Sequence, residues 1–389
     1  MKSTYLCASI LLLFNSTIQA RPVGSDGKIV VAYWADWTGF SPNSVDFSKI
    51  THVNYAFAIP QASGAVTAPS ALGSLVTAAH SANTQVLLSL GGWGGSATFS
   101  SIVASPGSRQ TFANSIKSIM DQYKLDGIDL DWEYPGVQGA CGNQISPQDT
   151  ANFLEFLKLL RSTVGNKLIT AATATTPFAG ADGKPSSDVR EFSEIFDWIN
   201  LMTYDLNGIW GLVTGPNAPL VKGSGGAATS VVDGVQSWMK AGVPNSKLTI
   251  GTAFYGHSMY AINSMATNQP HEQFVAVQGG SNEHNCAGGG FSKSIDWIKI
   301  RQYLSNPTTA NSPWIRQYDN ITQTPWLYNP GTKQYISYDD PQSLARKVQY
   351  AGCMNLKGVM LWEISQDNGE LLPVLDKIAS AQGGQNCEH

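Results

Sequence analysis

Short apolar segments rich in β-branched residues recur along the chain and alternate with stretches of helical periodicity. This alternation is typical of parallel strands joined by helices, because strands covered on both faces are apolar almost throughout. Eight segments are predicted to be strands: Lys28–Trp34, Ile50–Phe57, Gln85–Leu90, Gly127–Asp131, Lys167–Ala172, Trp198–Thr203, Leu248–Ala253 and Gly358–Trp362. Helices predicted between or after them include Ser108–Tyr123, Asp149–Val164, Ser230–Ala241, Pro341–Tyr350 and Glu370–Ala379. Eight such units predict an α/β fold, a closed (β/α)8 TIM barrel with its active site at the C-terminal strand ends.

The rhythm of strands and helices breaks after the seventh strand. Residues from about His257 to Tyr338 form a long segment that is rich in Gly, Asn and aromatic residues. A connection of that length within a compact domain carries secondary structure of its own. We therefore predict a small α+β insertion subdomain at 257–338, between strand seven and helix seven. The rest of 21–389 is expected to be a single catalytic barrel domain.

The first twenty residues have the pattern of a secretory signal peptide, with Lys2, an apolar run over Leu6–Phe14 and a small residue at Ala20. This apolar run is shorter than the roughly twenty residues that cross a bilayer. The sequence thus predicts a signal peptide over 1–20 and a secreted, extracellular protein that is not held in a membrane.

Four cysteines follow the predicted signal peptide: Cys141, Cys286, Cys353 and Cys387. An even number in an oxidising compartment predicts two disulfide bonds, for which three pairings are possible. The expected topology places the first two on the catalytic face and the last two on the opposite face. It therefore favours Cys141–Cys286 and Cys353–Cys387. Asn320 begins the single glycosylation sequon of the mature chain.

Composition narrows the possible partners. Only 13% of the residues are charged, the formal net charge is -4, and no Lys/Arg cluster occurs. Nucleic acid binding requires a concentrated basic surface, so no nucleic acid partner is expected. An uncharged polar ligand fits this composition better. A monomer is the expected state.

Three carboxyl side chains share one face of the fourth predicted strand. Asp129, Asp131 and Glu133 alternate with Ile128, Leu130 and Trp132, so the carboxyls point into the barrel and the apolar residues point toward the helices. Packing does not account for three inward carboxyls, since a barrel core excludes charge. At least one of them should keep a proton near neutral pH, and the outermost, Glu133, is the candidate acid. An acidic edge strand or a calcium loop is the alternative, but the spacing lacks the ligand pattern of an EF-hand.

The segment Asp126–Glu133 has the pattern D-x-x-D-x-D-x-E and resembles the signature of family 18 glycoside hydrolases, the family of secreted chitinases. Further segments are similar to motifs of that family in the same order: Ser89–Trp93, Met202–Asp205, Phe254–Gly256 and Gly358–Glu363. The resemblance runs from about Lys28 to Ile378. It implies an endo-acting chitinase that cleaves β-1,4-linked N-acetylglucosamine in chitin and chitooligosaccharides, without metal or cofactor.

The resemblance also implies a mechanism in which the substrate supplies the nucleophile. The carbonyl oxygen of its N-acetyl group attacks the anomeric carbon, which gives an oxazolinium ion and retention of configuration. Glu133 would protonate the leaving oxygen and then act as a base. Asp131 would hold the acetamide N–H and share a proton with Asp129. The Tyr204 hydroxyl would support the acetamide carbonyl, and Asp205 would adjust the local field and contact the sugar.

Sugar contacts are expected mainly from aromatic side chains, because pyranose rings present flat C–H faces. The resemblance implies that Trp362 forms the floor of the site and that further residues line it: Tyr33, Phe57, Gly92, Trp93, Met202, Tyr255, His257 and Met360. His257 stands where many family members carry Arg. Trp37 and Trp210 are further candidates at flanking subsites. Four aromatic residues are expected in the core instead: Trp132, Trp198, Trp238 and Tyr350.

Two other functions are compatible with the same fold. One is an endo-β-N-acetylglucosaminidase that trims N-glycan cores, and the other is a non-catalytic chitin-binding lectin. The insertion and the aromatic lining favour the chitinase over the first, because an added wall deepens a groove for a polymer. Glu133, Asp131 and Tyr204 are all present, which favours an enzyme over a lectin.

Overall fold

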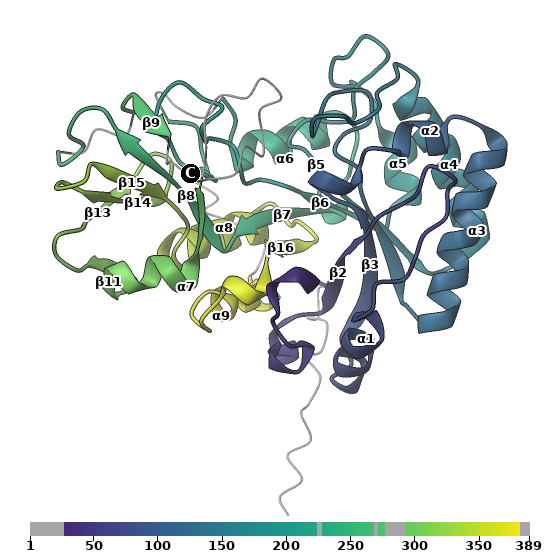
Figure 1. Cartoon of the computed structure of the whole chain (residues 1–389), viewed down its shortest axis with the longest axis horizontal. Helices are drawn as coiled ribbons and strands as arrows, with labels where there is room; N and C mark the ends of the chain where they lie inside the picture. Colours follow the sequence, from purple (N-terminus) through teal and green to yellow (C-terminus); the bar gives the residue numbers. More distant parts are fainter. Residues whose placement is uncertain (1–26, 224–227, 268–270, 277–292, 382–389) are drawn as a thin grey trace, which may run out of the picture.

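The computed structural model describes residues 27–223, 228–267, 271–276 and 293–381 (Figure 1). Eight parallel strands form the predicted closed barrel, in the order β1-β16-β7-β6-β5-β4-β3-β2. Their bounds are Ile29–Ala35 (β1), His52–Ala58 (β2), Gln85–Gly91 (β3), Gly127–Asp131 (β4), Leu168–Thr173 (β5), Trp198–Leu201 (β6), Leu248–Ala253 (β7) and Gly358–Trp362 (β16). Each strand agrees with its predicted segment to within two residues at either end.

Side chains alternate between the barrel lumen and the helix layer, as the sequence predicted. On β4, Ile128 and Leu130 belong to the large apolar cluster outside the barrel, whereas Asp129 and Asp131 face the lumen. The lumen cluster draws on inward positions of other strands, such as Val31 and Met360. The register of the barrel places Ser89 of β3 and Thr170 of β5 beside Asp129, so polar side chains of both neighbouring strands meet this carboxyl in the lumen.

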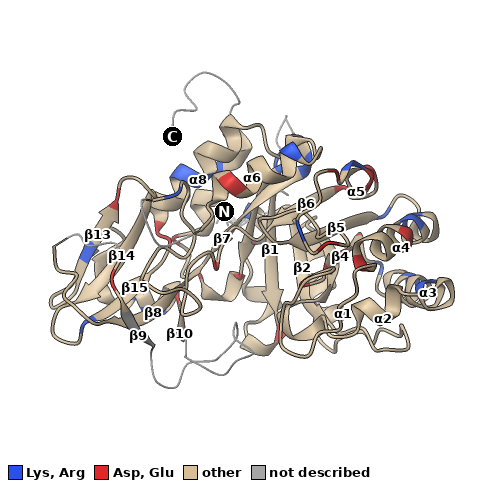
Figure 2. Ribbon diagram, turned by 90° about the horizontal axis from the view of Figure 1, so that it is seen from above, with Lys and Arg blue, Asp and Glu red and all other residues tan. Residues whose placement is uncertain are grey.

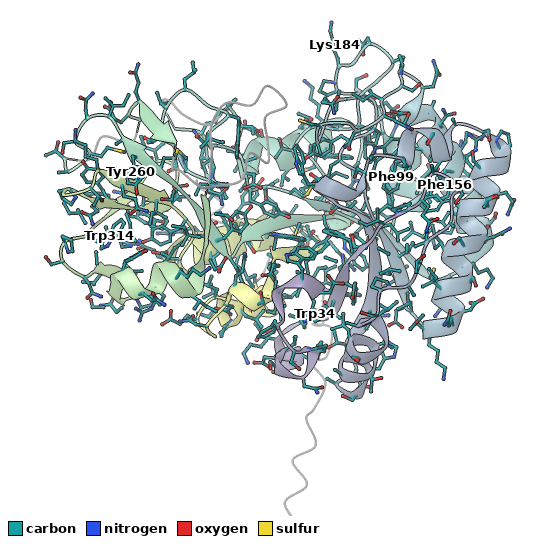
Figure 3. All side chains as sticks on the ribbon, in the orientation of Figure 1. Trp34, Phe99, Phe156, Lys184, Tyr260 and Trp314 are labelled. Carbon is teal, nitrogen blue, oxygen red and sulfur yellow. The ribbon has the colours of Figure 1, made fainter. Side chains whose placement is uncertain are left out.

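Helices cover the outside of the barrel. They are α1 (Leu72–Ser81), α2 (Phe99–Val103), α3 (Pro106–Tyr123), α4 (Asp149–Val164), α5 (Arg190–Ile195), α6 (Val231–Lys240), α8 (Pro341–Cys353) and α9 (Leu372–Leu375). Phe99 of α2 and Phe156 of α4, labelled in Figure 3, are buried in the large apolar cluster that these helices share with the strands. Lys and Arg occur on α3, α4, α5 and α8 and are not gathered in one region (Figure 2).

The last predicted helix is shorter than expected. The structure replaces Glu370–Ala379 by α9 and a 3₁₀ helix over Asp376–Ser380. The Asp367 carboxylate accepts hydrogen bonds from the backbone N–H groups of Leu371 and Leu372. These bonds fix a turn ahead of the helix, so the helix begins later than the apolar pattern indicates.

The insertion after β7 forms a separate antiparallel sheet with the order β10-β8-β15-β14-β13, and β9 pairs with β8. Its strands are β8 (Tyr255–Ala261), β9 (Phe274–Ala276), β10 (Lys293–Asp296), β13 (Ile315–Asp319), β14 (Thr324–Asn329) and β15 (Gln334–Ser337). A helix, α7 (Trp297–Ile300), and a hairpin of β11 (Leu304–Asn306) and β12 (Thr309–Ala310) complete it. The sheet therefore begins at Tyr255, two residues before the predicted start.

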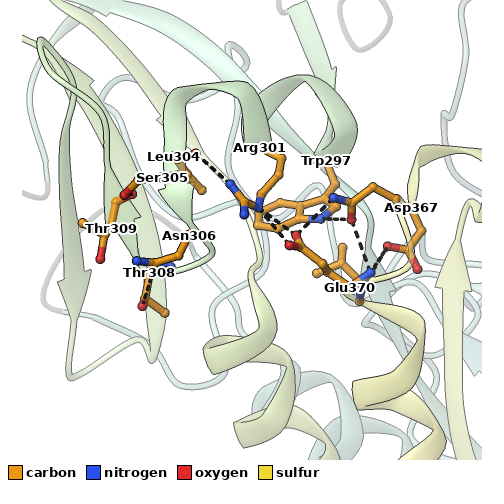
Figure 4. Close-up of polar contacts among 11 residues, drawn as sticks. Trp297, Arg301, Leu304, Ser305, Asn306, Thr308, Thr309, Asp367 and Glu370 are labelled. Carbon is orange, nitrogen blue, oxygen red and sulfur yellow. Dashed lines mark hydrogen bonds and ion pairs between the residues drawn. The ribbon is translucent and has the colours of Figure 1, made fainter.

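Polar contacts tie the insertion to the segment after β16 (Figure 4). The buried Trp297 donates from Nε1 to Asn368 Oδ1 at 2.9 Å, and Arg301 Nε lies 2.9 Å from Glu370 Oε2. These bonds join α7 and the 3₁₀ helix that follows it, Arg301–Tyr303, to the turn that leads into α9. The insertion is therefore attached to the barrel beside the end of β16.

Some predictions fall on residues outside the described part of the chain. The signal peptide 1–20 does, and each predicted disulfide includes one such cysteine, Cys286 or Cys387. The pairing therefore stays a prediction.

Asn320 is exposed in the turn between β13 and β14. Within the described ranges, every helix is too short or too polar to cross a membrane.

Candidate active site

The three inward carboxyls lie on β4 and two residues beyond its end, so they run from the lumen toward the opening of the barrel. Asp129 is fully buried, while Asp131 and Glu133 are only 3% and 8% exposed. Asp126, which precedes the strand, has a structural role at the other end of the barrel. Its Oδ2 lies 2.8 Å from His80 Nε2 and accepts the Val86 N–H. Of the four acids in this segment, the first therefore has a structural role, and the last lies nearest the mouth of the barrel.

Asp129 is the centre of a buried hydrogen-bond network. Its Oδ2 accepts from the Tyr33 hydroxyl at 2.7 Å and from Ser89 Oγ at 2.8 Å. Its Oδ1 accepts from Thr170 Oγ1 at 2.5 Å and from Asn200 Nδ2 at 3.4 Å. Burial raises the pKa of Asp129, and these donors oppose the rise. Both oxygens are therefore held by neutral side chains of other strands.

Asp131 differs from Asp129 in having an unpaired oxygen. Within the described residues, its Oδ1 is buried and has no hydrogen-bond partner. Burial raises the pKa of Asp131 well above its usual range, and the charges of Glu133 and Asp129 add to the effect. A buried acceptor without a donor is unfavourable by about 1–3 kcal/mol, so this oxygen is prepared for a ligand.

The backbone of Glu133 is held by hydrogen bonds, and its surroundings raise the pKa of its carboxyl. Its N–H donates to Ser96 Oγ at 3.0 Å, and Asn143 Nδ2 donates to its carbonyl at 2.8 Å. Gly139 makes room for this carbonyl, because a Cβ there would lie 1.9 Å from the oxygen. Burial and the charge of Asp205 raise the pKa of Glu133 to about 7. Glu133 can therefore carry a proton to a ligand near neutral pH.

Asp205 lies opposite these acids, in the loop after β6. Its φ of 55° is in the left-handed region, and its N–H donates to Asn217 Oδ1 at 2.8 Å. Oδ1 of Asp205 lies 2.7 Å from the Tyr255 hydroxyl and 2.6 Å from His257 Nε2. The insertion strand β8 thus reaches a carboxylate of the barrel.

A cavity of about 400 Å³ opens above these groups. It is lined by Trp37, Phe57, Ile59, Gly91, Trp93, Gly94, Gly95, Asp131, Glu133, Met202, Tyr204, Asp205, Tyr255 and Trp362. The Phe57 and Trp362 rings are stacked, with centroids 5.5 Å apart. Trp37 stacks on Phe57 at 6.0 Å and is 61% exposed. The result is an aromatic wall that faces the acids.

Four predicted binding residues support this cavity and do not line it. Tyr33 is buried below Trp362, with ring centroids 5.4 Å apart, and donates to Asp129. Met360 accepts a weak bond from the Tyr204 hydroxyl at 3.8 Å. His257 stands behind Asp205.

The fourth, Gly92, has a steric role. Its φ is +80°, and a Cβ there would lie 2.6 Å from Cε2 of Phe57. Glycine at this position therefore lets the Phe57 ring approach the backbone after β3, which shapes the aromatic wall.

Comparison with known families identifies this arrangement. The profile described as "Glycosyl hydrolases family 18" matches residues 29–367, from the first strand of the barrel to the turn after the last. The chain belongs to this family. As a family 18 member it is a glycoside hydrolase, and the carboxyls of β4 lie on the face where a barrel enzyme carries its chemistry.

Relatives within family 18 match over most of the chain. A chitinase-like effector of Moniliophthora roreri is 33% identical over 411 residues, which cover 98% of this chain and 99% of that protein. Chitinase A1 of Niallia circulans is 28% identical and covers 94% of this chain and 60% of that protein. The crystal structure of a chitinase from Rhizomucor miehei superimposes with a TM-score of 0.84 at 33% identity, covering 90% of this chain and 100% of that chain.

The sequence did not indicate every residue of the family 18 site. Ile59, Gly91, Gly94 and Gly95 line the cavity but were not predicted to do so. The glycine-rich run that begins at the last residue of β3 was the available signal for three of them. Within the described ranges, no group of three or more His, Cys, Asp or Glu could hold a metal ion.

A second cavity of about 700 Å³ adjoins the first and shares Trp37 and Trp362 with it. Its other lining residues are mostly polar: Thr38, Gly39, Phe40, Ser294, Asp296, Glu363, Ser365 and Gln366. The cleft of this family 18 chain thus continues toward β10 of the insertion.

The other aromatic predictions divide into two groups. All four residues predicted for the core are buried: Trp132, Trp198, Trp238 and Tyr350. Trp210, a candidate for a flanking subsite, lies with its ring edge on His257 and does not line either cavity described above.

Proposed function

We propose that this family 18 chain is a chitinase that hydrolyses β-1,4-linked N-acetylglucosamine polymers with retention of configuration. The observation that carries the proposal is the unpaired, buried Oδ1 of Asp131, near Glu133, whose pKa is raised to about 7. An acetamide N–H is the donor that this oxygen lacks, and an acetamide held there can use its own carbonyl oxygen as the nucleophile.

Glu133 acts first as the acid and then as the base. It gives its proton to the glycosidic oxygen while the bond from C1 to that oxygen breaks and the acetamide oxygen bonds to C1. Water then attacks C1, and Glu133 takes a proton from it. The bond between C1 and the acetamide oxygen breaks, which restores the N-acetyl group. A pKa of about 7 for Glu133 suits both steps near neutral pH.

Asp131 and Tyr204 orient the acetamide. Asp131 accepts its N–H and opposes the positive charge that develops on the oxazolinium ion. Tyr204 lines the cavity, and among the described residues its hydroxyl has one hydrogen-bond partner, Met360 Sδ at the long distance of 3.8 Å, so it can donate to the acetamide carbonyl instead. Asp129 keeps its four donors throughout and acts on Asp131 through its charge.

The shape of the cleft supports an endo-acting enzyme on a polymer. The two adjoining cavities, of about 400 and about 700 Å³, offer room for more than one sugar, and the aromatic wall of the first suits their flat faces. The names of the relatives agree, since one is Chitinase A1. Another relative is named "chitinase-like effector", a name that does not state catalysis, so we keep a second candidate, a chain that binds chitin without cleaving it.

The proposal extends to the form in which the enzyme acts. The N-terminal pattern and the cysteine count support export of 21–389 as a monomeric catalytic domain with two disulfide bonds. N-terminal sequencing of the exported protein should give Arg21 as the first residue, and peptide mapping should give Cys141–Cys286. A map with Cys141 joined to Cys387 would rule out that pairing.

The test compares wild type with Glu133→Gln, which keeps the shape of the side chain and removes its proton. Fluorophore release from chitobiose and chitotriose glycosides should fall at least about a hundredfold in the variant. Glu155→Gln, at an exposed glutamate of α4, is the matched control and should retain activity. If neither wild type nor Glu133→Gln cleaves but both bind chitin oligomers, the chain is a binding protein. Cleavage of an N-glycoprotein alone would assign it to N-glycan cores.

A further inference from the structure

His257 is buried, with 4% of its surface exposed, and it does not line the cleft. It lies on β8, two residues after Tyr255, so both side chains leave the strand on the same face. Both reach Oδ1 of Asp205, at 2.6 Å from His257 and 2.7 Å from Tyr255. A strand of the insertion therefore fixes a carboxylate of the barrel.

Packing holds the imidazole ring in place. The Trp210 ring meets it edge-on with centroids 5.5 Å apart, and the Tyr255 ring meets it in the same way at 5.7 Å. Gly208 makes room for Trp210, because a Cβ there would lie 2.2 Å from the indole ring. Ring packing of this kind leaves the imidazole little rotational freedom.

The hydrogen-bond chemistry determines what His257 supplies. A carboxylate oxygen accepts only, and the Tyr255 hydroxyl donates to Oδ1 of Asp205. The imidazole must then donate as well, so its Nε2 carries a hydrogen. With two donors on one oxygen, the Asp205 carboxylate keeps one orientation while 30% of its side chain stays exposed at the cleft.

We propose that His257 is a positioning residue, which orients the Asp205 carboxylate toward the substrate and sets how strongly its charge acts on Glu133. The inference rests on the proposed function. Asp205 and Tyr255 are titratable groups that face the ring, while Ser294 and Ser337, its neighbours on β10 and β15, carry no charge. An arginine at this position would place a permanent cation beside Asp205, whereas an imidazole is charged only when both ring nitrogens carry a proton.

Three variants test the proposal on the full chain. His257→Leu removes the donor and keeps an apolar side chain, His257→Gln keeps a neutral N–H donor, and His257→Arg adds a permanent charge. Since the charge of Asp205 helps to raise the pKa of Glu133, His257→Arg should move the alkaline limb of kcat/KM to lower pH by about one pH unit. His257→Leu should lower kcat at least about tenfold, with a smaller change in KM. His257→Gln should restore kcat to within about threefold of wild type.

The matched control is His80→Leu. His80 makes a similar contact, 2.8 Å from Asp126 Oδ2, at the opposite end of β4. The His80→Leu variant should therefore have the wild-type kcat and the wild-type alkaline limb of kcat/KM. Circular dichroism of each variant checks that it is folded, and if His257→Arg does not fold, the Leu and Gln variants decide.

The outcomes separate this inference from the proposed function. An inactive wild type would overturn both. An active wild type would overturn only the role of His257 if folded His257→Leu kept full kcat, or if His257→Gln lost as much as His257→Leu. The same conclusion would follow if a folded, active His257→Arg kept the wild-type alkaline limb.

Discussion

The proton on Glu133 should make the stability of this protein depend on pH, and Glu133→Gln should remove that dependence. Burial and the charge of Asp205 raise the pKa of Glu133 to about 7 in the folded chain, from 4.5 in a free side chain. Between these values the folded chain binds the proton and the unfolded chain does not. The free energy of unfolding therefore falls as the pH rises from 4.5 through 7.

The size of the effect follows from the gap of about 2.5 between the two pKa values. One pKa unit corresponds to about 1.4 kcal/mol, so the ionisation of Glu133 lowers the free energy of unfolding by about 3 kcal/mol above pH 7. Glutamine carries no charge, so this cost is absent from the variant. The charge of Glu133 also raises the pKa of Asp131, and its loss acts in the same direction.

Calorimetry of wild type and Glu133→Gln at pH 4, 6 and 8 measures this difference. The melting temperature of the variant, relative to wild type, should rise by about 6 °C between pH 4 and pH 8, at about 2 °C for each kcal/mol. Glu155→Gln controls for the loss of one exposed carboxyl. If the difference between Glu133→Gln and wild type is the same at all three pH values, Glu133 is not protonated in the folded chain, and the reasoning about the acid fails.

Three further predictions concern the same site. The kcat/KM of wild type should fall above about pH 7, because Glu133 must be protonated to act as the acid, and a plateau to pH 9 would contradict this. Gly92→Ala should lower the free energy of unfolding, measured by denaturant titration, by about 3 kcal/mol, because the added methyl group would lie 2.6 Å from the Phe57 ring at a φ of +80°. The control is Gly94→Ala, whose methyl group would meet nothing within 4 Å. It should change the free energy of unfolding by less than about 0.5 kcal/mol. Tyr33→Phe should cost about 2 kcal/mol in that titration, because it removes a buried donor 2.7 Å from Asp129, and an unchanged midpoint would show that this bond contributes nothing.

Local patterns in the sequence were sufficient for the barrel and for the acids. Alternating apolar positions specify a strand with two buried faces, and that periodicity does not depend on the partner strands. The same alternation placed Asp129, Asp131 and Glu133 on one face, because side chains of a strand point in opposite directions at successive residues. Core positions such as Trp132 followed from the same pattern.

Only the tertiary structure decided which predicted residues touch the cleft. Tyr33 and His257 were both predicted to line the site, yet the Tyr33 ring packs against Trp362 from within the barrel core and His257 lies behind Asp205. Their depth depends on how β1 and β8 meet other strands, and no local pattern encodes that.

The chemistry of the site also depends partly on the sequence and partly on the tertiary structure. The sequence by itself determined which ionisable groups are present and on which strand they lie. Their charge states depend on burial and on donors from elsewhere in the chain, such as Ser89 and Thr170 on Asp129. Closure of the barrel brings these groups within hydrogen-bond distance of one another and excludes water. A pKa is set by that distance and that desolvation, which arise only when the chain is folded.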